Sequence, residues 1–531
     1  MTTNGLTLAR IDRSTVPATI ALPRHYNAAA DFIDRHVAEG RGDRIAFIDD
    51  AGAVTYGELA DRVNRAGNML LDLGLRPEDR VAMIMLDSTA FPAVFFGAIK
   101  AGLVPIPVNT LLTTADYDYI LRDSRARALV VSAPLWPTVG PAARDQPRLA
   151  SIIVDGPATD GHPALGDMMA TASGVLDAAD TVCDEPAFWL YSSGSTGRPK
   201  GAVHLQSDMI ATAVHYGEGI LGLTQDDVVF SAAKLFFAYG LGNAMSFPLF
   251  AGATAVLMAE RPTPDSVMAR LDRHDPTVFY GVPTLYAAML AGPPPEARPG
   301  GRRLRVCVSA GEALPREIGL RWRQRFGTDI LDGIGSTEML HIFLSNRQGA
   351  VSYGTTGKPV PGYEVRLTHE DGSPVADGEI GDLWVSGPSS ASCYWNNRPK
   401  SLETFHGPWT RTGDKYMVDA DGNYVYQGRS DDMLKVSGIW VSPFEVEQAL
   451  AEHPAVQEAA VVGRSDADDL VKPEAHVLLV AGHAGTPELA IELQLFIKER
   501  LAPHKYPRWV HFVDELPKTA TGKTQRFKLR G

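Results

Sequence analysis

The segment "RVAMIMLDSTAFPAVFFGAIKAGLVPIPV", residues 80–108, contains two short apolar runs separated by a longer one. Residues 80–86 and 104–108 are typical of buried strands, and residues 88–102 favour a helix that ends on Gly102. Strands joined through a helix pair in parallel, with helices on both faces of the sheet. The segment therefore predicts an α/β fold.

The same alternation continues through the middle of the chain. We expect strands at residues 253–259, 277–281, 305–311 and 329–335, and helices at residues 264–274, 283–290 and 315–326. In such sheets ligands bind beyond the carboxyl ends of the strands. We therefore look for the site in the loops that follow these strands.

The C-terminal hundred residues are predicted to form a compact α+β unit of their own. Ser442 and Glu445 have the spacing of a capping box, and Pro443 lies between them at the first helical position, so a helix is expected to begin there. The boundary is placed at residues 428–432, where glycine and polar residues suit a hinge.

The composition is that of a folded globular protein, with 45% hydrophobic and 21% charged residues among 531. The 50 basic and 63 acidic residues give a net charge of −13, which argues against binding to nucleic acid or to an anionic membrane. Residues 1–15 have no apolar core of signal-peptide length, and the longest apolar region, residues 244–259, is interrupted by Pro248 and Gly252. We expect a cytoplasmic location.

Cysteine usage gives no sign of a metal site. The chain has three cysteines, Cys183, Cys307 and Cys393, which lie far apart and form no C-x-x-C pair. This pattern fits a reducing compartment, and we interpret the cysteines as packing residues.

The stretch "YSSGSTGRPKG", residues 191–201, has the composition of a phosphate-binding loop. Its glycines let the backbone approach an anion, its hydroxyls and amides donate hydrogen bonds, and Lys200 supplies charge. A glycine-rich surface turn is an equally good interpretation of this composition alone. It is not a Walker A loop, and residues 517–524 also fail that pattern because Pro517 replaces the first glycine.

Two further segments carry carboxylates after turns. Residues 332–338, "DGIGSTE", end on Glu338, which could hold Mg²⁺ together with phosphate oxygens; a capping turn is the alternative. Residues 411–414, "RTGD", end on Asp414, which could accept hydrogen bonds from a ribose diol, although such a sequence alone is usually a turn.

Taken together, these motifs resemble those of the adenylate-forming enzymes, which include acyl- and aryl-CoA synthetases, peptide-synthetase adenylation domains and luciferase. The motifs occur in the family's order at residues 191–201, 309–315, 332–338, 411–414, 428–438 and 517–526. The resemblance covers nearly the whole chain. It implies a large N-terminal domain of packed βα subdomains with a smaller β subdomain, residues 1–429, and a mobile C-terminal lid, residues 430–531.

The resemblance also implies the reaction and its residues. In this family a carboxylate attacks the α-phosphate of ATP, pyrophosphate leaves, and a thiol such as that of CoA then attacks the acyl adenylate. The implied phosphate loop consists of Ser192, Ser193, Gly194, Thr196, Gly197 and Lys200. The resemblance further assigns Gly311, Glu312, Asp332 and Gly333 to the adenine, Asp414 and Arg429 to the ribose, Thr337 to the α-phosphate and Glu338 to Mg²⁺.

Lys523 matches the catalytic lysine of the family. Its ammonium would bridge the attacking carboxylate and the α-phosphate, where charge develops during displacement. The lid is expected to rotate about Asp431 between the two half-reactions. This rotation would withdraw Lys523 and bring Lys435 and Gly438 beside a pantetheine tunnel.

The substrate segments resemble those of benzoate-CoA ligases and, slightly less closely, 4-hydroxybenzoate-CoA ligases. Amino-acid-activating relatives have an aspartate where this chain has Phe237, so an amino-acid substrate is not expected. Ala238, Tyr239, Gly335 and His341 would line a flat slot, which suits a planar apolar ring, and Phe237 would be a gate near the carboxylate. His341 has two open roles, as a wall against the ring or as a hydrogen-bond partner of a ring hydroxyl.

Three functions are compatible with these motifs. An aromatic acid–CoA ligase that uses ATP, CoA and Mg²⁺ is favoured over an aryl-AMP ligase that loads a carrier protein. A silent acyl-adenylate binder is disfavoured because Lys200, Glu338, Asp414 and Lys523 are all present. The expected partners are small molecules, and the sequence leaves a homodimer open.

Overall fold

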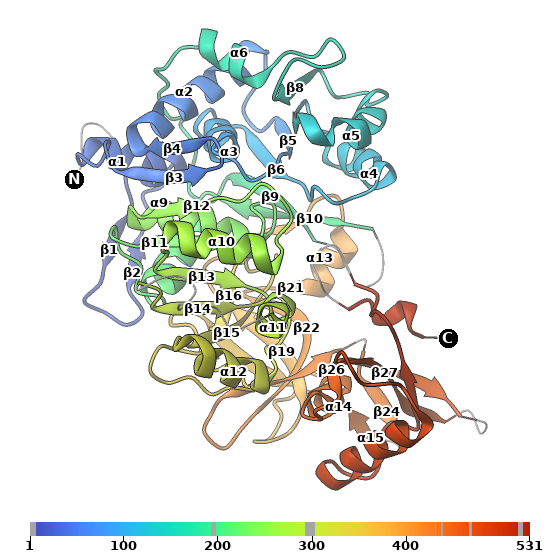
Figure 1. Ribbon diagram of the computed structural model, residues 1–531. Coiled ribbons are helices and arrows are strands. Elements are labelled where there is room, and N and C mark those ends of the chain that lie inside the picture. The colour runs from blue at the N-terminus through green and yellow to red at the C-terminus, as the bar shows by residue number, and fades with distance from the viewer. Residues whose placement is uncertain are drawn as a thin grey trace.

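The protein consists of a large N-terminal part and a smaller C-terminal part, which is red in Figure 1. The computed structural model describes residues 7–192, 198–292, 303–430, 432–436, 439–466, 470–518 and 524–530. Within these ranges no helix combines the length and apolar character needed to cross a bilayer.

A nine-stranded sheet forms the centre of the large part. In spatial order its strands are β17 (Lys358–Pro359), β16 (Ile342–Ser345), β15 (Ile330–Gly335), β14 (Val306–Ser309), β13 (Val278–Gly281), β11 (Val228–Ser231), β12 (Thr254–Val256), β3 (Ile45–Asp49) and β4 (Gly52–Thr55). The strands from β15 to β3 run parallel, and those at both edges are antiparallel. The strands expected between residues 253 and 335 are all present, within shorter bounds.

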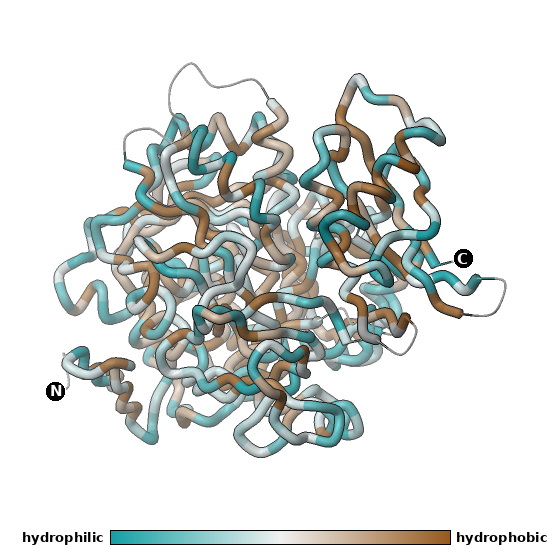
Figure 2. Tube along the Cα trace, turned by 90° about the horizontal axis from the view of Figure 1, so that it is seen from below, coloured by the Kyte–Doolittle hydropathy of each residue, from teal (hydrophilic) through white to brown (hydrophobic). Residues whose placement is uncertain are grey.

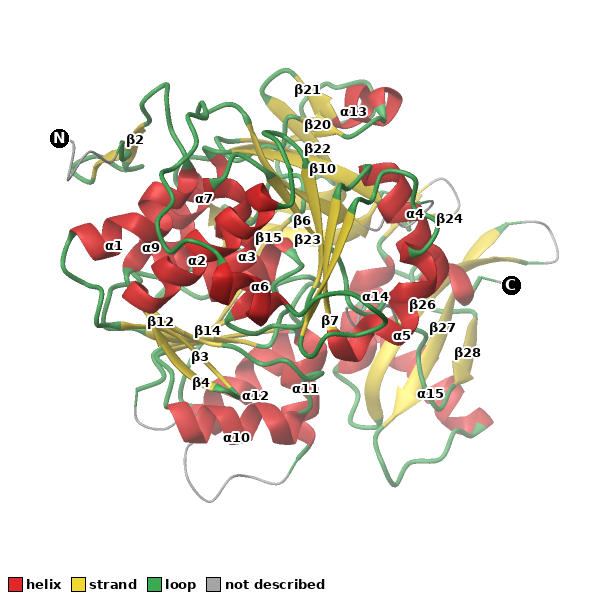
Figure 3. Ribbon diagram, turned by 90° about the horizontal axis from the view of Figure 1, so that it is seen from above, coloured by secondary structure: helices red, strands yellow, loops and turns green. Residues whose placement is uncertain are grey.

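Helices cover both faces of this sheet (Figure 3). One face carries α10 (Pro264–His274), α11 (Pro283–Ala291) and α12 (Arg316–Phe326), and the other carries α1 (Arg35–Ala38), α2 (Tyr56–Asp72), α3 (Ala90–Lys100) and α9 (Phe247–Ala251). Trp322 of α12 packs with Phe279 of β13 in the core of the first face. Burial on both faces explains why these strands are apolar throughout.

A second, four-stranded sheet contains the segment from which the fold class was predicted. Its order is β6 (Val104–Pro107), β5 (Arg80–Ile84), β7 (Ala128–Ser132) and β8 (Ser151–Asp155), all parallel, with α4 (Thr114–Ser124), α5 (Trp136–Ala143) and α6 (Leu165–Thr171) nearby. The expected strand–helix–strand unit is thus β5, α3 and β6. Gly102 follows the helix with φ +75°, a conformation that favours glycine.

The glycine-rich stretch lies between two strands of a third sheet. β9 (Pro186–Ser192) pairs antiparallel with β10 (Lys200–Leu205), and β20 (Cys393–Tyr394) lies along the other side of β10. The loop-like composition of residues 191–201 gave no indication of β10, which begins with Lys200 and Gly201 at the end of that stretch. The helix α7 (Asp208–Thr212) and a π-helical turn, Ala213–Glu218, begin only after β10.

The remaining elements of the large part are mainly antiparallel. A five-stranded sheet contains β18 (Glu364–Thr368), β19 (Gly381–Ser386), β22 (Trp409–Val418), β23 (Tyr424–Arg429) and the short β21 (Phe405–His406), next to α13 (Arg398–Thr404). The N-terminal hairpin is β1 (Arg10–Asp12) and β2 (Thr19–Ala21), and α8 (Ala238–Leu241) lies in the segment after β11.

The C-terminal part has its own hydrophobic core. It contains β24 (Leu434–Val436), β25 (Ile439–Val441), α14 (Pro443–Ala451), β26 (Val456–Ser465), β27 (Val471–Leu479), α15 (Pro487–Arg500) and β28 (Trp509–Phe512). Leu450, Val461 and Leu493 are buried together there. Figure 2 shows this part as a separate lobe with hydrophobic segments running through it.

The predicted start of α14 is only half of a capping box. Ser442 Oγ accepts a hydrogen bond from the Glu445 N–H at 3.0 Å, as expected for an N-cap. The Glu445 carboxylate does not complete the box, because it binds Lys505 Nζ at 2.6 Å. A long-range ion pair has replaced the second, local hydrogen bond.

Candidate active site

A cavity of about 2610 Å³ opens between the large part and the C-terminal part. Its walls include the end of β15, the middle of β22, the start of β10 and the segment around α8. The cavity brings together the predicted residues Ser192, Lys200, Phe237, Ala238, Tyr239, Gly311, Glu312, Asp332, Gly333, Gly335, Thr337, Glu338, His341, Asp414 and Arg429.

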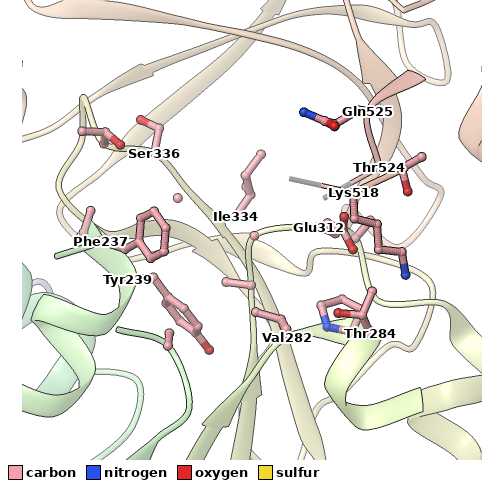
Figure 4. A pocket seen from close by; sticks show the side chains of 18 of the residues that line it. Phe237, Tyr239, Val282, Thr284, Glu312, Ile334, Ser336, Lys518, Thr524 and Gln525 are labelled. Atoms are coloured by element: carbon pink, nitrogen blue, oxygen red, sulfur yellow. The ribbon is translucent and has the colours of Figure 1, made fainter. Parts of the chain in front are cut away.

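The other predicted site residues lie outside the described part of the chain. These are Ser193, Gly194, Thr196, Gly197, Asp431, Gly438 and Lys523; for Lys435 only the backbone, in β24, is described. Lys518 and Thr524 flank the segment of Lys523, form a β-bridge with each other and line the cavity. Figure 4 shows both of them beside Glu312, across the cavity from Phe237 and Tyr239.

The turn after β15 holds Thr337 and Glu338 through main-chain contacts. His204 Nε2 lies 2.8 Å from the Thr337 carbonyl oxygen, and Asp208 Oδ2 lies 2.9 Å from His204 Nδ1. The Ala391 N–H donates to the Glu338 carbonyl at 2.7 Å. The side chains of His204 and Asp208 are buried. The turn is therefore held by a hydrogen bond from the protein core.

The Glu338 carboxylate has a polar and a cationic neighbour. The Tyr394 hydroxyl donates to Glu338 Oε1 at 2.6 Å, and Lys200 Nζ lies 5.0 Å from the centre of the Tyr394 ring. Burial, followed by the charge of Glu338, raises the pKa of Tyr394, so the phenol stays protonated. Burial lowers the pKa of Lys200, and the nearby Glu338 opposes that shift.

Asp414 and Arg429 face each other on paired strands. Arg429 Nη1 lies 3.1 Å from Asp414 Oδ1, and the two residues are direct partners in the β22–β23 register. Gly413 has φ +76°, and a Cβ at this position would lie 2.9 Å from Arg429 Nη2. The glycine of the "RTGD" segment therefore gives Arg429 room to reach the carboxylate.

Asp332 is a buried carboxyl group at the cavity wall. Burial raises its pKa well above the ordinary value, opposed by hydrogen bonds from the backbone of Leu314 and Gly333. Its Oδ1 has no hydrogen-bond partner among the described residues. This carboxyl oxygen is therefore left for a hydrogen bond with a ligand that enters the cavity.

His341 lines the cavity, and one of its ring nitrogens is already engaged. Its Nε2 is 3.1 Å from Asn243 Oδ1 and 3.3 Å from the Tyr239 carbonyl oxygen, so Nε2 carries the proton. Burial lowers the pKa of His341 to about 3, which leaves a neutral ring at pH 7. Nδ1 is then an acceptor, and it has no partner among the described residues.

The walls around His341 are aromatic. The Phe247 ring centre lies 4.5 Å and the Tyr216 ring centre 5.2 Å from the imidazole centre. The Tyr239 hydroxyl donates to the carbonyls of the central sheet, at 3.1 Å to Val308, and is not available to a ring substituent. Among the described residues, the surroundings of His341 are therefore mainly aromatic, and Nδ1 is a buried acceptor within them.

Comparison with known proteins identifies the family of the chain. The model of the AMP-binding enzyme family matches residues 34–395, and that of the AMP-binding enzyme C-terminal domain matches residues 445–523. The chain belongs to the AMP-binding enzyme family. The expected relation to adenylate-forming enzymes is therefore confirmed, as is the α/β fold with a large N-terminal and a small C-terminal part.

Relatives of this AMP-binding enzyme match over nearly their whole length. The benzoate–CoA ligase of Thauera aromatica is 59% identical over 528 residues, which cover 99% of each chain. The 4-hydroxybenzoate–CoA/benzoate–CoA ligase of Rhodopseudomonas palustris is 53% identical and covers 96% of this chain and 94% of its own. The crystal structure of a benzoate CoA ligase from Burkholderia xenovorans LB400 has a TM-score of 0.89, 55% identity, and coverage of 95% and 100%.

Some residues of the cavity were not found from the sequence. Tyr394 is 56 residues from its partner Glu338 and has no local pattern that would identify it. Lys234 lines the cavity, donates to the Glu260 carbonyl at 2.7 Å and lies 3.9 Å from Asp87 Oδ2. Burial raises the pKa of Asp87 to about 6, and Lys234 opposes that shift.

Proposed function

We propose that this AMP-binding enzyme is a benzoate–CoA ligase. The observation that carries the proposal is that the apolar slot around His341 and the Thr337–Glu338 turn line one cavity, with only two residues between Glu338 and His341. A benzoate ring in the slot would thus place its carboxylate toward the turn. Two relatives above 50% identity are named as ligases of benzoate, which supports this substrate.

In the first half-reaction a benzoate oxygen attacks the α-phosphorus of ATP, and the bond to the departing pyrophosphate breaks. Asp414 and Arg429 bind the ribose, while Gly311, Glu312, Asp332 and Gly333 border the adenine. Thr337 donates to the α-phosphate. Lys200 and the loop residues Ser192, Ser193, Gly194, Thr196 and Gly197 hold the phosphates that leave. Lys523 neutralises the charge that develops between carboxylate and phosphate.

The side chains present fit a magnesium ion that arrives with ATP. No group of three or more His, Cys, Asp or Glu side chains within the described ranges could hold a metal by itself. Mg²⁺ in nucleotide sites is often bound by one or two carboxylates and the substrate phosphates, and Glu338 supplies such a carboxylate. The ion would neutralise phosphate charge there.

In the second half-reaction the CoA sulfur attacks the carbonyl carbon of benzoyl-AMP. The thiol gives up its proton, the mixed anhydride breaks and AMP leaves with the electron pair. The proposed domains are residues 1–429 and the lid 430–531, which turns about Asp431. Lys435 and Gly438 would then border the tunnel for the pantetheine.

The second candidate substrate is 4-hydroxybenzoate. His341 Nδ1 has no protein partner among the described residues and is the acceptor that a ring hydroxyl could use. An aryl-AMP ligase that loads a carrier protein is the alternative for the acceptor. We also propose a cytoplasmic location, where ATP and CoA occur. The oligomeric state is a separate question, and light scattering of the purified protein will show whether it is a homodimer.

The test is pyrophosphate release from Mg·ATP with benzoate, 4-hydroxybenzoate, 2-aminobenzoate, phenylacetate or a medium-chain fatty acid, each with and without CoA. We expect benzoate to give the highest kcat/KM and to form a thioester and AMP only with CoA. Preference for the fatty acid would contradict the aromatic slot. Adenylate formation without any transfer to free CoA would favour the carrier-protein alternative.

A further inference from the structure

We propose that Tyr394 is a positioning residue for Glu338, whose hydroxyl holds one carboxylate oxygen so that the other faces the cation arriving with ATP. The inference rests on the proposed function, in which Glu338 binds that cation. Tyr394 itself would touch neither the nucleotide nor the metal. Its role would be to select one orientation of the carboxylate before ATP binds.

The main chain around Glu338 is held without any help from Tyr394. Three successive carbonyl oxygens accept hydrogen bonds from outside the turn. His204 Nε2 donates to the Thr337 carbonyl at 2.8 Å, and the Ala391 N–H donates to the Glu338 carbonyl at 2.7 Å. Ser389 Oγ donates to the Met339 carbonyl at 2.8 Å. What remains to be fixed at Glu338 is therefore the side chain.

The Tyr394 hydroxyl supplies that constraint. It donates to Glu338 Oε1 at 2.6 Å, the length of a strong bond to an ionised acceptor. A phenol keeps its proton at neutral pH and a carboxylate can only accept, so Tyr394 is the donor in this contact. Oε2 receives no hydrogen bond from the described residues, so it is the oxygen left for a ligand.

Tyr394 is itself positioned by the strand that begins with Lys200. Tyr394 pairs with Ala202 across the β20–β10 ladder, and its N–H donates to Ser401 Oγ at 2.9 Å. Lys200 is diagonal to Tyr394 in this ladder and lies over its ring. One aromatic side chain thus contacts both the lysine of the phosphate loop and the proposed metal carboxylate.

The structure offers a matched control in the same region. Tyr363 is also a buried tyrosine, and its hydroxyl lies 2.7 Å from Ser389 Oγ, which in turn donates to the Met339 carbonyl. Tyr363→Phe removes a buried hydroxyl that supports the turn but leaves the Glu338 carboxylate and its partner in place. It therefore reports the purely structural effect of such a loss.

The experiment measures the dissociation constant of α,β-methylene-ATP, which cannot be cleaved at the reacting bond, with Mg²⁺ and with EDTA. In Tyr394→Phe we expect affinity with Mg²⁺ to fall about tenfold, the scale of one lost hydrogen bond to a charged group, and affinity in EDTA to stay at the wild-type value. Tyr363→Phe should keep the wild-type ratio of the two constants. Circular dichroism and thermal unfolding establish that each variant is folded.

An unchanged ratio in Tyr394→Phe would overturn the proposal, as would an equal loss of affinity with Mg²⁺ and with EDTA. The double variant Tyr394→Phe/Glu338→Gln gives an independent readout. It should bind Mg²⁺ and nucleotide no more weakly than Glu338→Gln alone, and additive losses would contradict a role through Glu338. A wild-type protein that shows the Mg²⁺-dependent affinity but no benzoate-dependent pyrophosphate release would overturn the proposed function and leave the role of Tyr394 intact.

Discussion

Replacing His341 by leucine tests the neutral imidazole that we assign to the aryl pocket. In the folded protein burial lowers the pKa of His341 from 6.5 to about 3. In the unfolded chain the imidazole is hydrated and titrates near 6.5. Between these two values the unfolded state binds a proton that the folded state does not, so the free energy of unfolding must decrease as the pH falls.

The size of the effect follows from the two pKa values. At pH 5.5, one unit below the unfolded pKa, the shift removes about 1.4 kcal/mol of stability, and at pH 7.5 almost none. The leucine variant does not have this dependence. It loses the donor to Asn243 Oδ1 instead, which lowers the free energy of unfolding by about 1–3 kcal/mol at both pH values. The difference in free energy of unfolding between wild type and variant should therefore be about 1.4 kcal/mol smaller at pH 5.5 than at pH 7.5.

Urea unfolding at the two pH values, followed by tryptophan fluorescence, measures this difference. His36→Leu is the matched control, because burial also lowers the pKa of His36, to about 2, and His36 does not line the cavity. Both variants should show the narrowing, and only His341→Leu should alter catalysis. A stability difference that stays constant for His341→Leu while it narrows for His36→Leu would refute the buried, neutral state of His341.

Three further predictions concern the reaction. Lys523→Ala should slow benzoate-dependent pyrophosphate release about 10²- to 10³-fold, and it should slow the attack of CoA on supplied benzoyl-AMP much less. Equal losses of rate in the two half-reactions would contradict a lysine that acts in only one of them. Asp414→Asn should raise the KM for ATP about tenfold, the scale of a lost charged hydrogen bond, with an unchanged KM for benzoate, and a parallel rise in both would argue against ribose binding. In initial-rate assays, His341→Leu should lower kcat/KM for 4-hydroxybenzoate about fivefold more than kcat/KM for benzoate, because the Nδ1 acceptor is lost. If the ratio of the two kcat/KM values did not change, the imidazole would act only as a wall of the pocket and not as a hydrogen-bond acceptor.

The elements that the sequence predicts well are those whose signal is local. The β5–α3–β6 unit is recognisable because its apolar runs match strand and helix lengths, and the start of α14 because Ser442 caps it within three residues. The carboxylate of Glu338 stands out because it ends a glycine-containing turn after β15. That of Asp414 stands out because it follows a glycine in a short motif, which the structure places inside β22 and not in a turn. In each case neighbours in sequence are neighbours in space.

Contacts between distant segments are what the sequence does not reveal. The second half of the expected capping box is absent because Glu445 binds Lys505, 60 residues away. β10 was missed because it is short and starts with a lysine and a glycine, and its partner β20 is nearly two hundred residues further along the chain. Tyr394 reaches Glu338 only through that pairing, so no pattern around either residue could have linked them.

The strand β10 also explains how Lys200, at the end of the proposed phosphate loop, is placed relative to the Thr337–Glu338 turn. Side chains alternate along a strand, so Lys200 and His204 point to the same face of β10. That face meets the turn twice, since His204 binds the Thr337 carbonyl and Lys200 lies over the ring of Tyr394, which binds Glu338. A slip of β10 by one residue would turn both side chains to the opposite face. The position of the loop lysine and the orientation of the Glu338 carboxylate are therefore set by the same strand pairing.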